Sequence, residues 1–383
     1  MKINLLSICS AFPADLNATR NLYLWHSLEA LKNMGVNPTL FTVDGWKPFK
    51  KKIDKTQFPI KIYSCRYFSI PRYTFYRISC FFYLKRVIPI LSDIIKKNKI
   101  DIIHAHGEIH GLAATILSQQ LGVPVVVTIH GIDMGLQVVS PRLRAQFLKM
   151  MSQVDRLVFV GGALAKHFFP MLAHHDHCRI IYNGFQLPDP IPFEKKANNP
   201  IRIISVCYLY EGKGVDLTLK ALGELKKQGI HDWVYTIIGS GDQKRLYEKI
   251  ISEYALHPHI IWLGECDHFR VYEELNKSDI FCLPSYREAF GIAYVEAMAH
   301  GLLTIAVQGQ GPEAFIKNNE TGFLVEAHNV DMLMNVLSSV IINNEHMLEI
   351  AIRGQQHVLE NFTWQQHAEK LFEIYKDLCF ETG

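Results

Sequence analysis

Residues 279–301 read DIFCLPSYREAFGIAYVEAMAHG: an apolar run, a polar turn, and from Phe290 onward a segment with helical spacing. A short apolar run rich in Ile, Phe and Leu is typical of a strand that is buried on both faces. The helix after it is apolar on nearly every face, which is typical of a helix inside a protein, yet it carries Glu296. Because a lone buried carboxylate is costly, we expect Glu296 to have a partner, from the protein or from a ligand.

Strand-and-helix units of this kind recur along the whole chain. Apolar runs rich in Ile and Val alternate with helical stretches both before residue 186 and after residue 200. Uninterrupted apolar runs predict parallel sheets with helical crossovers in each half. The predicted strands are INLLSIC, NPTLFTV, IDIIHAH, VPVVVTIH, RLVFVG, RIIYNG, IRIISVCYL, WVYTIIGSG, HIIWLGE, DIFCLPS, LTIAVQG and GFLVE.

A segment with linker composition separates the two halves. Residues 186–200, QLPDPIPFEKKANNP, are dominated by proline, charge and asparagine. At 383 residues the chain is also too long for one typical core. We therefore predict an α/β fold of two doubly wound, Rossmann-like domains that face each other across a cleft at the carboxyl ends of their strands. The predicted parts are a first domain at 1–188, a linker at 189–200, a second domain at 201–360, and a final helix within 361–383 that crosses back toward the first domain.

The composition excludes several functional classes. A net charge of +3 is too small for a typical nucleic-acid binder, which concentrates a strong basic excess on one face. The eight cysteines are scattered without a Cys-x-x-Cys pair, which is typical of a reducing compartment. The N-terminus lacks a signal-peptide cleavage pattern, and no run reaches the roughly 18 apolar residues of a spanning helix. We therefore expect a cytoplasmic protein.

Two glutamates lie in the turn and in the helix of residues 279–301. Glu288 lies in the turn, Glu296 lies in the helix, and Gly291 stands between them. Backbone N–H groups at the start of such a helix favour an anion, for example a phosphate. The alternatives are a plain helix-terminal carboxylate at Glu288 and a buried ion-pair partner at Glu296.

Two glycine turns follow strands of the second half. Lys213 and Gly214, in YEGKGVD, lie between a strand end and a helix start, where a lysine can reach a phosphate. An exposed lysine in a turn is the alternative. Gly239 and Gly241, in IIGSGDQ, also follow a strand but lack the third glycine of a dinucleotide-binding motif.

Histidines gather at strand ends of the first half. His130, in TIHGID, follows a strongly apolar strand, where it can bind a polar substrate group or have a structural role. His104, His106 and His110 resemble a cluster of metal-binding histidines, as does the HHDH run at 174–177. Neither group has the spacing of a defined metal site.

In their order and spacing these motifs resemble the retaining GT-B glycosyltransferases of family 4, also called glycosyltransferase group 1, over essentially the whole chain. Such enzymes transfer a sugar from a nucleotide diphosphate sugar to an acceptor. The most specific element is the Glu-x7-Glu motif, here Glu288 to Glu296. It is accompanied by EGKGVD, by Asn183-Gly184, by GQGPEAF with Glu313, by ETGFLV and by FTWQQHAEKLFEIY.

The resemblance implies a role for each motif residue. In the second, nucleotide-sugar-binding domain, Glu296 would bind the ribose hydroxyls, Glu288 would face the donor sugar, and Lys213 would neutralise the diphosphate. His130 of the first, acceptor-side domain would contact the transferred sugar and is grouped with Glu288 and Lys213 as catalytic. The other implied donor-binding residues are Tyr208, Gly214, Gly239, Phe290 and Gly291.

The resemblance also implies that neither a metal nor a cofactor is needed, since the nucleotide diphosphate sugar is a co-substrate. Lys213 and a helix N-terminus can supply the charge stabilisation that a cation would otherwise give. In the family, attack from the front face, with the leaving phosphate helping to take the acceptor proton, retains the anomeric configuration without a protein nucleophile.

Two positions depart from the family pattern. Tyr208 stands where the family usually has a second cation, an arginine, which should weaken leaving-group stabilisation by about a few kcal/mol unless Arg287 substitutes for it. The loop SAFPADLNATRN lacks the family's glycine pair and offers Asn17 and Thr19 there.

A basic, aromatic stretch at 60–86 contains no acidic residue. It can lie on an anionic membrane surface, which would favour a lipid-linked glycan as acceptor. The alternative is a packed helix whose basic ends extend to water. The cations assigned to the acceptor or membrane side are Arg66, Arg72, Arg77, Lys85 and Arg86.

Three functions follow from these patterns. The Glu-x7-Glu spacing favours a hexosyltransferase that acts on a glycan or lipid-linked glycan in cell-surface polysaccharide or lipopolysaccharide biosynthesis. Tyr208 suggests, as an alternative, a nucleotide-sugar binding protein with weak or no transfer, and an epimerase on the same scaffold is the third. The protein is expected in the cytoplasm, either free or peripheral on the cytoplasmic face of the membrane.

Overall fold

The computed structural model describes residues 2–10, 12–16, 18, 21–45, 53–69, 76–131, 141–186 and 197–380. The chain divides into two compact units. Unit 1 comprises Met1–Gly184 with Trp364–Gly383, and unit 2 comprises Phe185–Thr363. The predicted ends of the first and second domains, 188 and 360, lie close to those of this division, but unit 2 begins at Phe185 rather than at 201 and so includes the predicted linker. Most of that linker lies outside the described residues.

Unit 1 is built on a parallel sheet of seven strands in the order β3-β2-β1-β4-β5-β6-β7. The direction in which strands are added reverses between β1 and β4. The central strands are buried almost throughout, as their continuous apolar sequences predict. The strands are β1 (Asn4–Cys9), β2 (Asn37–Gly45), β3 (Lys61–Tyr67), β4 (Ile102–His106), β5 (Val125–Ile129), β6 (Arg156–Phe159) and β7 (Cys178–Ile180).

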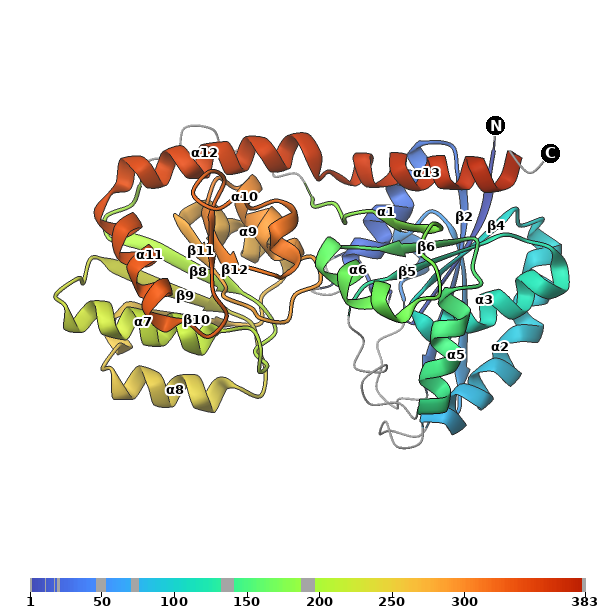
Figure 1. The fold of residues 1–383 in the computed structure, drawn as a ribbon, viewed down its shortest axis with the longest axis horizontal. Helices are drawn as coiled ribbons and strands as arrows, with labels where there is room; N and C mark the ends of the chain where they lie inside the picture. The colour runs from blue at the N-terminus through green and yellow to red at the C-terminus, as the bar shows by residue number, and fades with distance from the viewer. Residues whose placement is uncertain are drawn as a thin grey trace. The chain divides into compact units, whose positions relative to one another are not determined.

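Helices cover both faces of this sheet (Figure 1). Right-handed crossovers place α1 on one face and α2, α3 and α5 on the other. In agreement, α1 packs against α13, whereas α2, α3 and α5 contact one another in a row. The helices of unit 1 are α1 (Leu22–Asn33), α2 (Tyr76–Asn98), α3 (Glu108–Leu121), α5 (Pro141–Met151), α6 (Gly162–Phe168) and α13 (Trp364–Phe380).

The sequence analysis missed the edge strand β3. This strand alternates between buried and exposed residues and carries two cations, so it lacks the continuous apolar run that was taken as the strand signal. The basic stretch at 60–86 is therefore not one packed helix, so the alternative interpretation given for it from the sequence is wrong. The stretch contains β3 and the first half of α2.

Unit 2 is built on a parallel sheet of six strands in the order β10-β9-β8-β11-β12-β13, and all six were predicted. The strands are β8 (Ile201–Val206), β9 (Trp233–Ile238), β10 (Ile260–Gly264), β11 (Ile280–Cys282), β12 (Leu303–Val307) and β13 (Phe323–Val325). The helices are α7 (Val215–Lys227), α8 (Lys244–Glu253), α9 (His268–Lys277), α10 (Ile292–Ala299), α11 (Val330–Ile342) and α12 (Asn344–Asn361). Among the helices of the described residues, none combines the length and apolar composition that crossing a membrane requires.

The final helix α13 follows unit 2 in sequence but packs in the core of unit 1. Its buried residues Leu371, Ile374 and Tyr375 join Leu24 and Leu28 of α1 in one hydrophobic cluster. The amphipathic pattern at 364–378 predicted this helix, and it belongs to unit 1, toward which it was predicted to cross back; the residues that it packs against came only from the structure.

We expect Leu371→Ala to lower the free energy of unfolding of unit 1 by about 2–5 kcal/mol, because the substitution leaves a cavity in a fully buried site. Glu373→Ala, an exposed position on the same helix, is the matched control and should change the free energy by less than about 0.5 kcal/mol. Urea unfolding monitored by tryptophan fluorescence measures both. Equal effects of the two substitutions would contradict the packing of α13 described here.

Candidate functional site

The candidate site of unit 2 lies where the strand order of its sheet reverses. β8 and β11 are neighbours in the sheet, although β9 and β10 follow β8 in the chain. Open parallel sheets bind ligands at the carboxyl ends of the strands at such a point. Lys213 follows β8 and Glu288 follows β11, and the Lys213 Nζ lies 2.7 Å from the Glu288 Oε2. The topology thus brings together two residues that are 75 positions apart.

The ion pair between Lys213 and Glu288 is largely withdrawn from water, with side chains that are 13% and 16% exposed. Burial by itself disfavours the charged lysine, but Glu288 and Tyr210 outweigh this effect and raise the pKa of Lys213 above its usual value. The ammonium also lies 5.4 Å from the centroid of the Tyr210 ring. Lys213 is therefore a permanent cation whose partner an incoming anion can replace.

Two glycines allow the turns around this pair to come close. Gly214 precedes α7 with a φ of 72°, and a β-carbon there would collide with the backbone of Pro284 at the end of β11. Gly291 precedes α10 with a φ of 95°, in the left-handed region that favours glycine. Both turns were predicted from sequence, but the close approach of Gly214 to Pro284 was not.

The loop after β12 holds the backbone of Glu288. The Glu288 N–H donates to the Gln310 Oε1 at 3.1 Å, and the Gly311 N–H donates to the Glu288 carbonyl oxygen at 2.9 Å. Glu313, which the sequence analysis singled out in this loop, accepts from the Gly309 N–H instead. Gln310 lies in the GQGPEAF motif, but only Glu313 of that motif was singled out from the sequence.

Phe290 belongs to the core of unit 2. Its ring centroid lies 5.4 Å from that of Phe315 and 6.2 Å from that of Phe362, and the residue is buried. Any contact between Phe290 and a ligand is therefore made by its backbone.

Glu296 has partners on α9. Its Oε1 lies 3.3 Å from the His268 Nε2 and accepts a hydrogen bond from the Tyr272 hydroxyl at 3.3 Å. The Glu296 side chain is only 12% exposed, and burial raises its pKa to about 8, although the hydrogen bond from Tyr272 opposes this shift. The buried carboxylate of Glu296, which was expected to need a partner, therefore has partners that the protein itself supplies. His268 and Tyr272 were missed, since they lie on a different helix without a linked spacing.

Tyr208 and Gly239 follow the ends of β8 and β9. Tyr208 is 50% exposed, and its ring centroid lies 6.1 Å from that of Tyr210. A β-carbon at Gly239 would collide with the backbone of the turn after β8, so these two turns touch. Arg287, the predicted substitute cation, is exposed and has its side-chain carbons beside Gly212.

In unit 1, His130 follows β5 and forms a pair with His106 at the end of β4. The His106 Nδ1 lies 3.0 Å from the His130 Nε2, the two rings stack at a centroid distance of 5.2 Å, and the His106 Nε2 lies 3.2 Å from the Ser7 Oγ. Burial, with a smaller effect of His367, lowers the pKa of His130 to about 3. His130 is therefore neutral, and its buried Nδ1 has no hydrogen-bond partner in the part of the chain that the structure describes.

The other histidines of the metal-like cluster are held by protein hydrogen bonds. The His104 Nδ1 lies 2.5 Å from the Tyr375 hydroxyl of α13, and its Nε2 lies 2.7 Å from the Thr128 Oγ1. The His110 Nδ1 lies 2.7 Å from the Tyr83 hydroxyl of α2. These bonds tie neighbouring helices and strands of unit 1 together.

The cations assigned to the acceptor or membrane side lie on two elements. Arg66 is exposed on β3, and Arg77, Lys85 and Arg86 are exposed on α2. Arg72 lies outside the described residues, as do Asn17 and Thr19 of the first loop.

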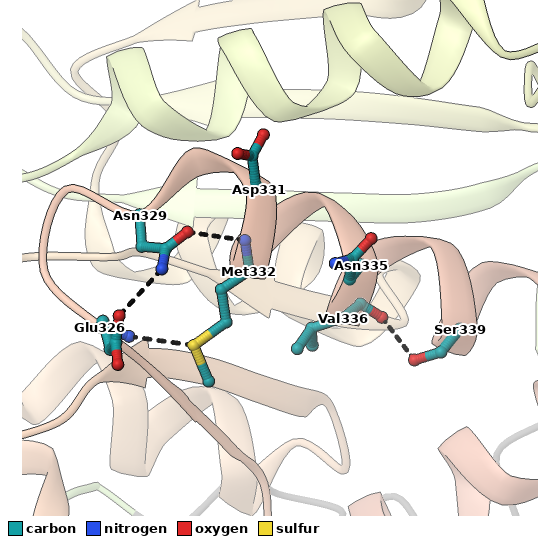
Figure 2. A pocket seen from close by; sticks show the side chains of 7 residues that line it. All are labelled: Glu326, Asn329, Asp331, Met332, Asn335, Val336 and Ser339. Atoms are coloured by element: carbon teal, nitrogen blue, oxygen red, sulfur yellow. Dashed lines mark hydrogen bonds between the residues drawn. The ribbon is translucent and has the colours of Figure 1, made fainter.

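A hollow at the start of α11 carries no candidate site (Figure 2). Two of its polar residues bond to each other and to the helix: the Asn329 Oδ1 accepts from the Met332 N–H that opens the helix, and the Asn329 Nδ2 donates to Glu326. This is the ordinary capping of a helix N-terminus.

Comparison with known proteins connects both units to glycosyl transfer. The family described as Glycosyl transferases group 1 matches residues 189–357, and Glycosyltransferase Family 4 matches residues 21–187. The chain is 26% identical over 328 residues to the phosphatidylinositol N-acetylglucosaminyltransferase gpi3 subunit of Schizosaccharomyces pombe, covering 82% of this chain and 69% of that protein.

Solved structures share the fold. Sucrose-phosphate synthase from Thermosynechococcus elongatus superposes with a TM-score of 0.78 at 19% identity, covering 98% of this chain and 99% of that one. Anabaena HepE in complex with UDP-glucose has a TM-score of 0.75 at 16% identity, covering 98% and 100%. Two parallel-sheet domains with such neighbours confirm the predicted GT-B fold. Since the two family matches together account for nearly all of the chain between residues 21 and 357, the chain belongs to the family 4, group 1 glycosyltransferases.

Proposed function

We propose that this protein transfers a hexosyl group from a nucleotide diphosphate sugar to a hydroxyl of a glycan or lipid-linked glycan, with retention of configuration and without a metal. The observation that carries the proposal is the buried ion pair between Lys213 and Glu288 at the reversal point of the unit 2 sheet. A cation at that point is suited to a diphosphate.

In the proposed reaction, the diphosphate replaces Glu288 as the partner of Lys213. Glu288 is then available to accept hydrogen bonds from the donor sugar, and Glu296 accepts them from the ribose diol. The bond between the anomeric carbon and the phosphate oxygen breaks as the acceptor oxygen bonds to that carbon, and the acceptor proton passes to the leaving diphosphate. Lys213 and the start of α10 stabilise the charge that develops on the leaving group.

The neutral His130 complements this arrangement. Its Nε2 is engaged by His106, while its Nδ1 has no partner among the described residues. We propose that the Nδ1 binds a hydroxyl of the transferred sugar. A neutral imidazole suits this role because it can donate or accept one hydrogen bond without adding charge.

The compared proteins support the substrate classes. The HepE structure contains UDP-glucose, and the name of the S. pombe relative specifies a phosphatidylinositol acceptor. We therefore favour a nucleotide diphosphate sugar as donor and a lipid-linked acceptor, with the protein in the cytoplasm and peripheral on the membrane in cell-surface glycan assembly. A nucleotide-sugar binding protein with little transfer is the second candidate, because the exposed phenol of Tyr208 cannot supply a permanent positive charge.

A thermal-unfolding screen against UDP, GDP, CDP and their common sugar conjugates tests the proposal. We expect one nucleotide sugar, at a hundredfold excess over its Kd, to stabilise the protein by about 2.7 kcal/mol. Glu296→Gln should remove most of this shift, because an amide has one acceptor oxygen for the two hydroxyls of a diol. Glu349→Gln, exposed on α12, is the matched control. Equal shifts in both variants would overturn the role of Glu296.

Once the donor is known, a second assay identifies the reaction. A transferase releases nucleoside diphosphate only when an acceptor is added, whereas a binding protein or an epimerase does not.

We expect the contribution of Glu296 to the stability of the ligand-free protein to fall as pH rises from 5 to 8, whereas the buried histidines, whose pKa values are lowered from 6.5, contribute with the opposite sign. Burial raises the pKa of Glu296 from 4.5 to about 8, so in this range the native state holds a proton that the unfolded chain has lost. This contribution to the free energy of unfolding is full below about pH 4.5 and decreases by at most about 1.4 kcal/mol per pH unit up to pH 8. Urea unfolding at several pH values isolates this contribution: the free energy of unfolding of wild type minus that of Glu296→Gln should decrease as pH rises from 5 to 8, and a difference that is constant with pH would refute the assignment.

Substitutions in the ion pair should separate binding from transfer. Glu288→Gln should tighten binding of the nucleoside diphosphate, because Lys213 loses its competing partner, and should lower the transfer rate at least about a hundredfold. Lys213→Gln should weaken the nucleoside diphosphate about ten- to a hundredfold, which is the usual cost of losing a charged hydrogen bond. Calorimetry with the nucleoside diphosphate and with the nucleoside alone measures both affinities.

The nucleoside affinity should stay unchanged in Lys213→Gln. Lys220→Gln, a half-exposed lysine of α7, serves as the control for a general loss of positive charge. If Lys213→Gln weakened nucleoside and nucleoside diphosphate equally, Lys213 would not be a diphosphate ligand.

A further inference from the structure

The exposed face of α2 differs from that of an ordinary surface helix. Its exposed positions between 77 and 89 recur at intervals of about four residues, so they form one continuous stripe. Most surface helices place charged and polar side chains on such a stripe. Here it consists of Arg77, Ile78, Phe81, Phe82, Lys85, Arg86 and Pro89.

Aromatic rings gather at the first half of this stripe. Phe81 is 60% exposed and Phe82 is 39% exposed, with their ring centroids 5.7 Å apart. Phe68, 59% exposed after the end of β3, packs edge-on against Phe82 at 5.4 Å. Three clustered phenylalanines of this exposure are costly in water, which indicates an interaction surface rather than scattered apolar residues.

An apolar hollow continues the surface along α2. Phe81, Leu84, Ile88 and Pro89 line it, and the side chain of Lys85 stands at its edge. The opposite face of α2 is anchored, because the buried Tyr83 hydroxyl lies 2.7 Å from the His110 Nδ1 of α3. The exposed apolar residues therefore stand on a fixed helix.

The charged side chains of the stripe on α2 are all positive. Arg77, Lys85 and Arg86 alternate with the phenylalanines along it, whereas Arg66, exposed on β3, stands in register with Asp44 of β2. Residues 55–92 contain no Asp or Glu. Cations interleaved with aromatic rings are typical of elements that lie in the interface of an anionic bilayer, where the rings enter the acyl boundary and the cations meet the headgroups.

We propose that this surface, made by Phe68, Phe81 and Phe82 with Arg77, Lys85 and Arg86, docks unit 1 onto an anionic membrane. The purpose of this docking rests on the proposed function, because docking would present a lipid-linked acceptor to the enzyme. The absence of acidic residues from the stripe and from residues 55–92 favours lipid headgroups over a protein partner, which would usually also require hydrogen-bonded or oppositely charged pairs at its rim.

Vesicle flotation with the full chain tests the proposal without any sugar substrate. We expect binding to vesicles of phosphatidylcholine with 30% phosphatidylglycerol and little binding to vesicles of pure phosphatidylcholine. Binding to the anionic vesicles should weaken as salt rises, because salt screens the attraction between the cations of the protein and the lipid headgroups. The charge variant Arg77→Gln/Lys85→Gln/Arg86→Gln should lower the partition coefficient about a hundredfold, as each cation contributes roughly fivefold. The aromatic variant Phe81→Ser/Phe82→Ser should lower it at least about tenfold.

Matched variants in unit 2 control for general changes in charge and apolar surface. Arg245→Gln/Lys249→Gln removes two exposed cations of α8, and Phe269→Ser removes a phenylalanine of α9 that is 75% exposed. Both should bind vesicles like wild type. Because all substituted side chains are exposed, the variants should keep the wild-type Tm and the nucleotide-sugar shift, so that loss of docking is distinguished from loss of the donor site.

Three outcomes of the flotation experiment would overturn the proposal: no binding to anionic vesicles by wild type, equal loss in the unit 2 controls, or unchanged binding in the charge and aromatic variants. Sedimentation of wild type and the aromatic variant examines self-association. If wild type is a dimer that Phe81→Ser/Phe82→Ser converts to a monomer, the surface joins two copies of the chain and the membrane assignment is wrong.

Discussion

The buried ion pair between Lys213 and Glu288 is the interaction on which the site of unit 2 depends. Two charges withdrawn from water lose solvation that their attraction barely repays, so such a pair is weak evidence for stability. The proposed binding of a diphosphate would explain why a cation lies at this point of the sheet. The close turns at Gly214 and Gly291 and the backbone bonds to Gln310 hold the pair in place.

Unit 1 presents a contrasting environment. Around His130 the described partners are neutral imidazoles and hydroxyls, and burial keeps the histidines uncharged. The Tyr375 hydroxyl that bonds to His104 comes from α13, which the chain reaches only after passing through unit 2. The polar network of unit 1 thus depends on α13, which contributes to the environment of the histidines as well as to the hydrophobic core.

Much of the fold was predictable because parallel strands buried on both faces leave a strong local signal. Six of the seven strands of unit 1, all six of unit 2 and the final helix follow from continuous apolar runs and amphipathic spacing. β3 does not, because an edge strand alternates and tolerates charge. The same holds in the site: Lys213, Glu288 and Glu296 lie in recognisable motifs and His130 follows a strongly apolar strand, whereas His268 and Tyr272 are isolated residues of another helix.

The sequence by itself determined the fold class, the family and the residues that bear charge at strand ends, because these depend on local composition and spacing. Only the tertiary structure decided which of them meet. The reversal of strand order between β8 and β11 pairs Lys213 with Glu288, and the packing of α9 gives Glu296 its partners and its raised pKa. Such contacts join residues tens of positions apart, and their energies depend on burial, which no local pattern specifies.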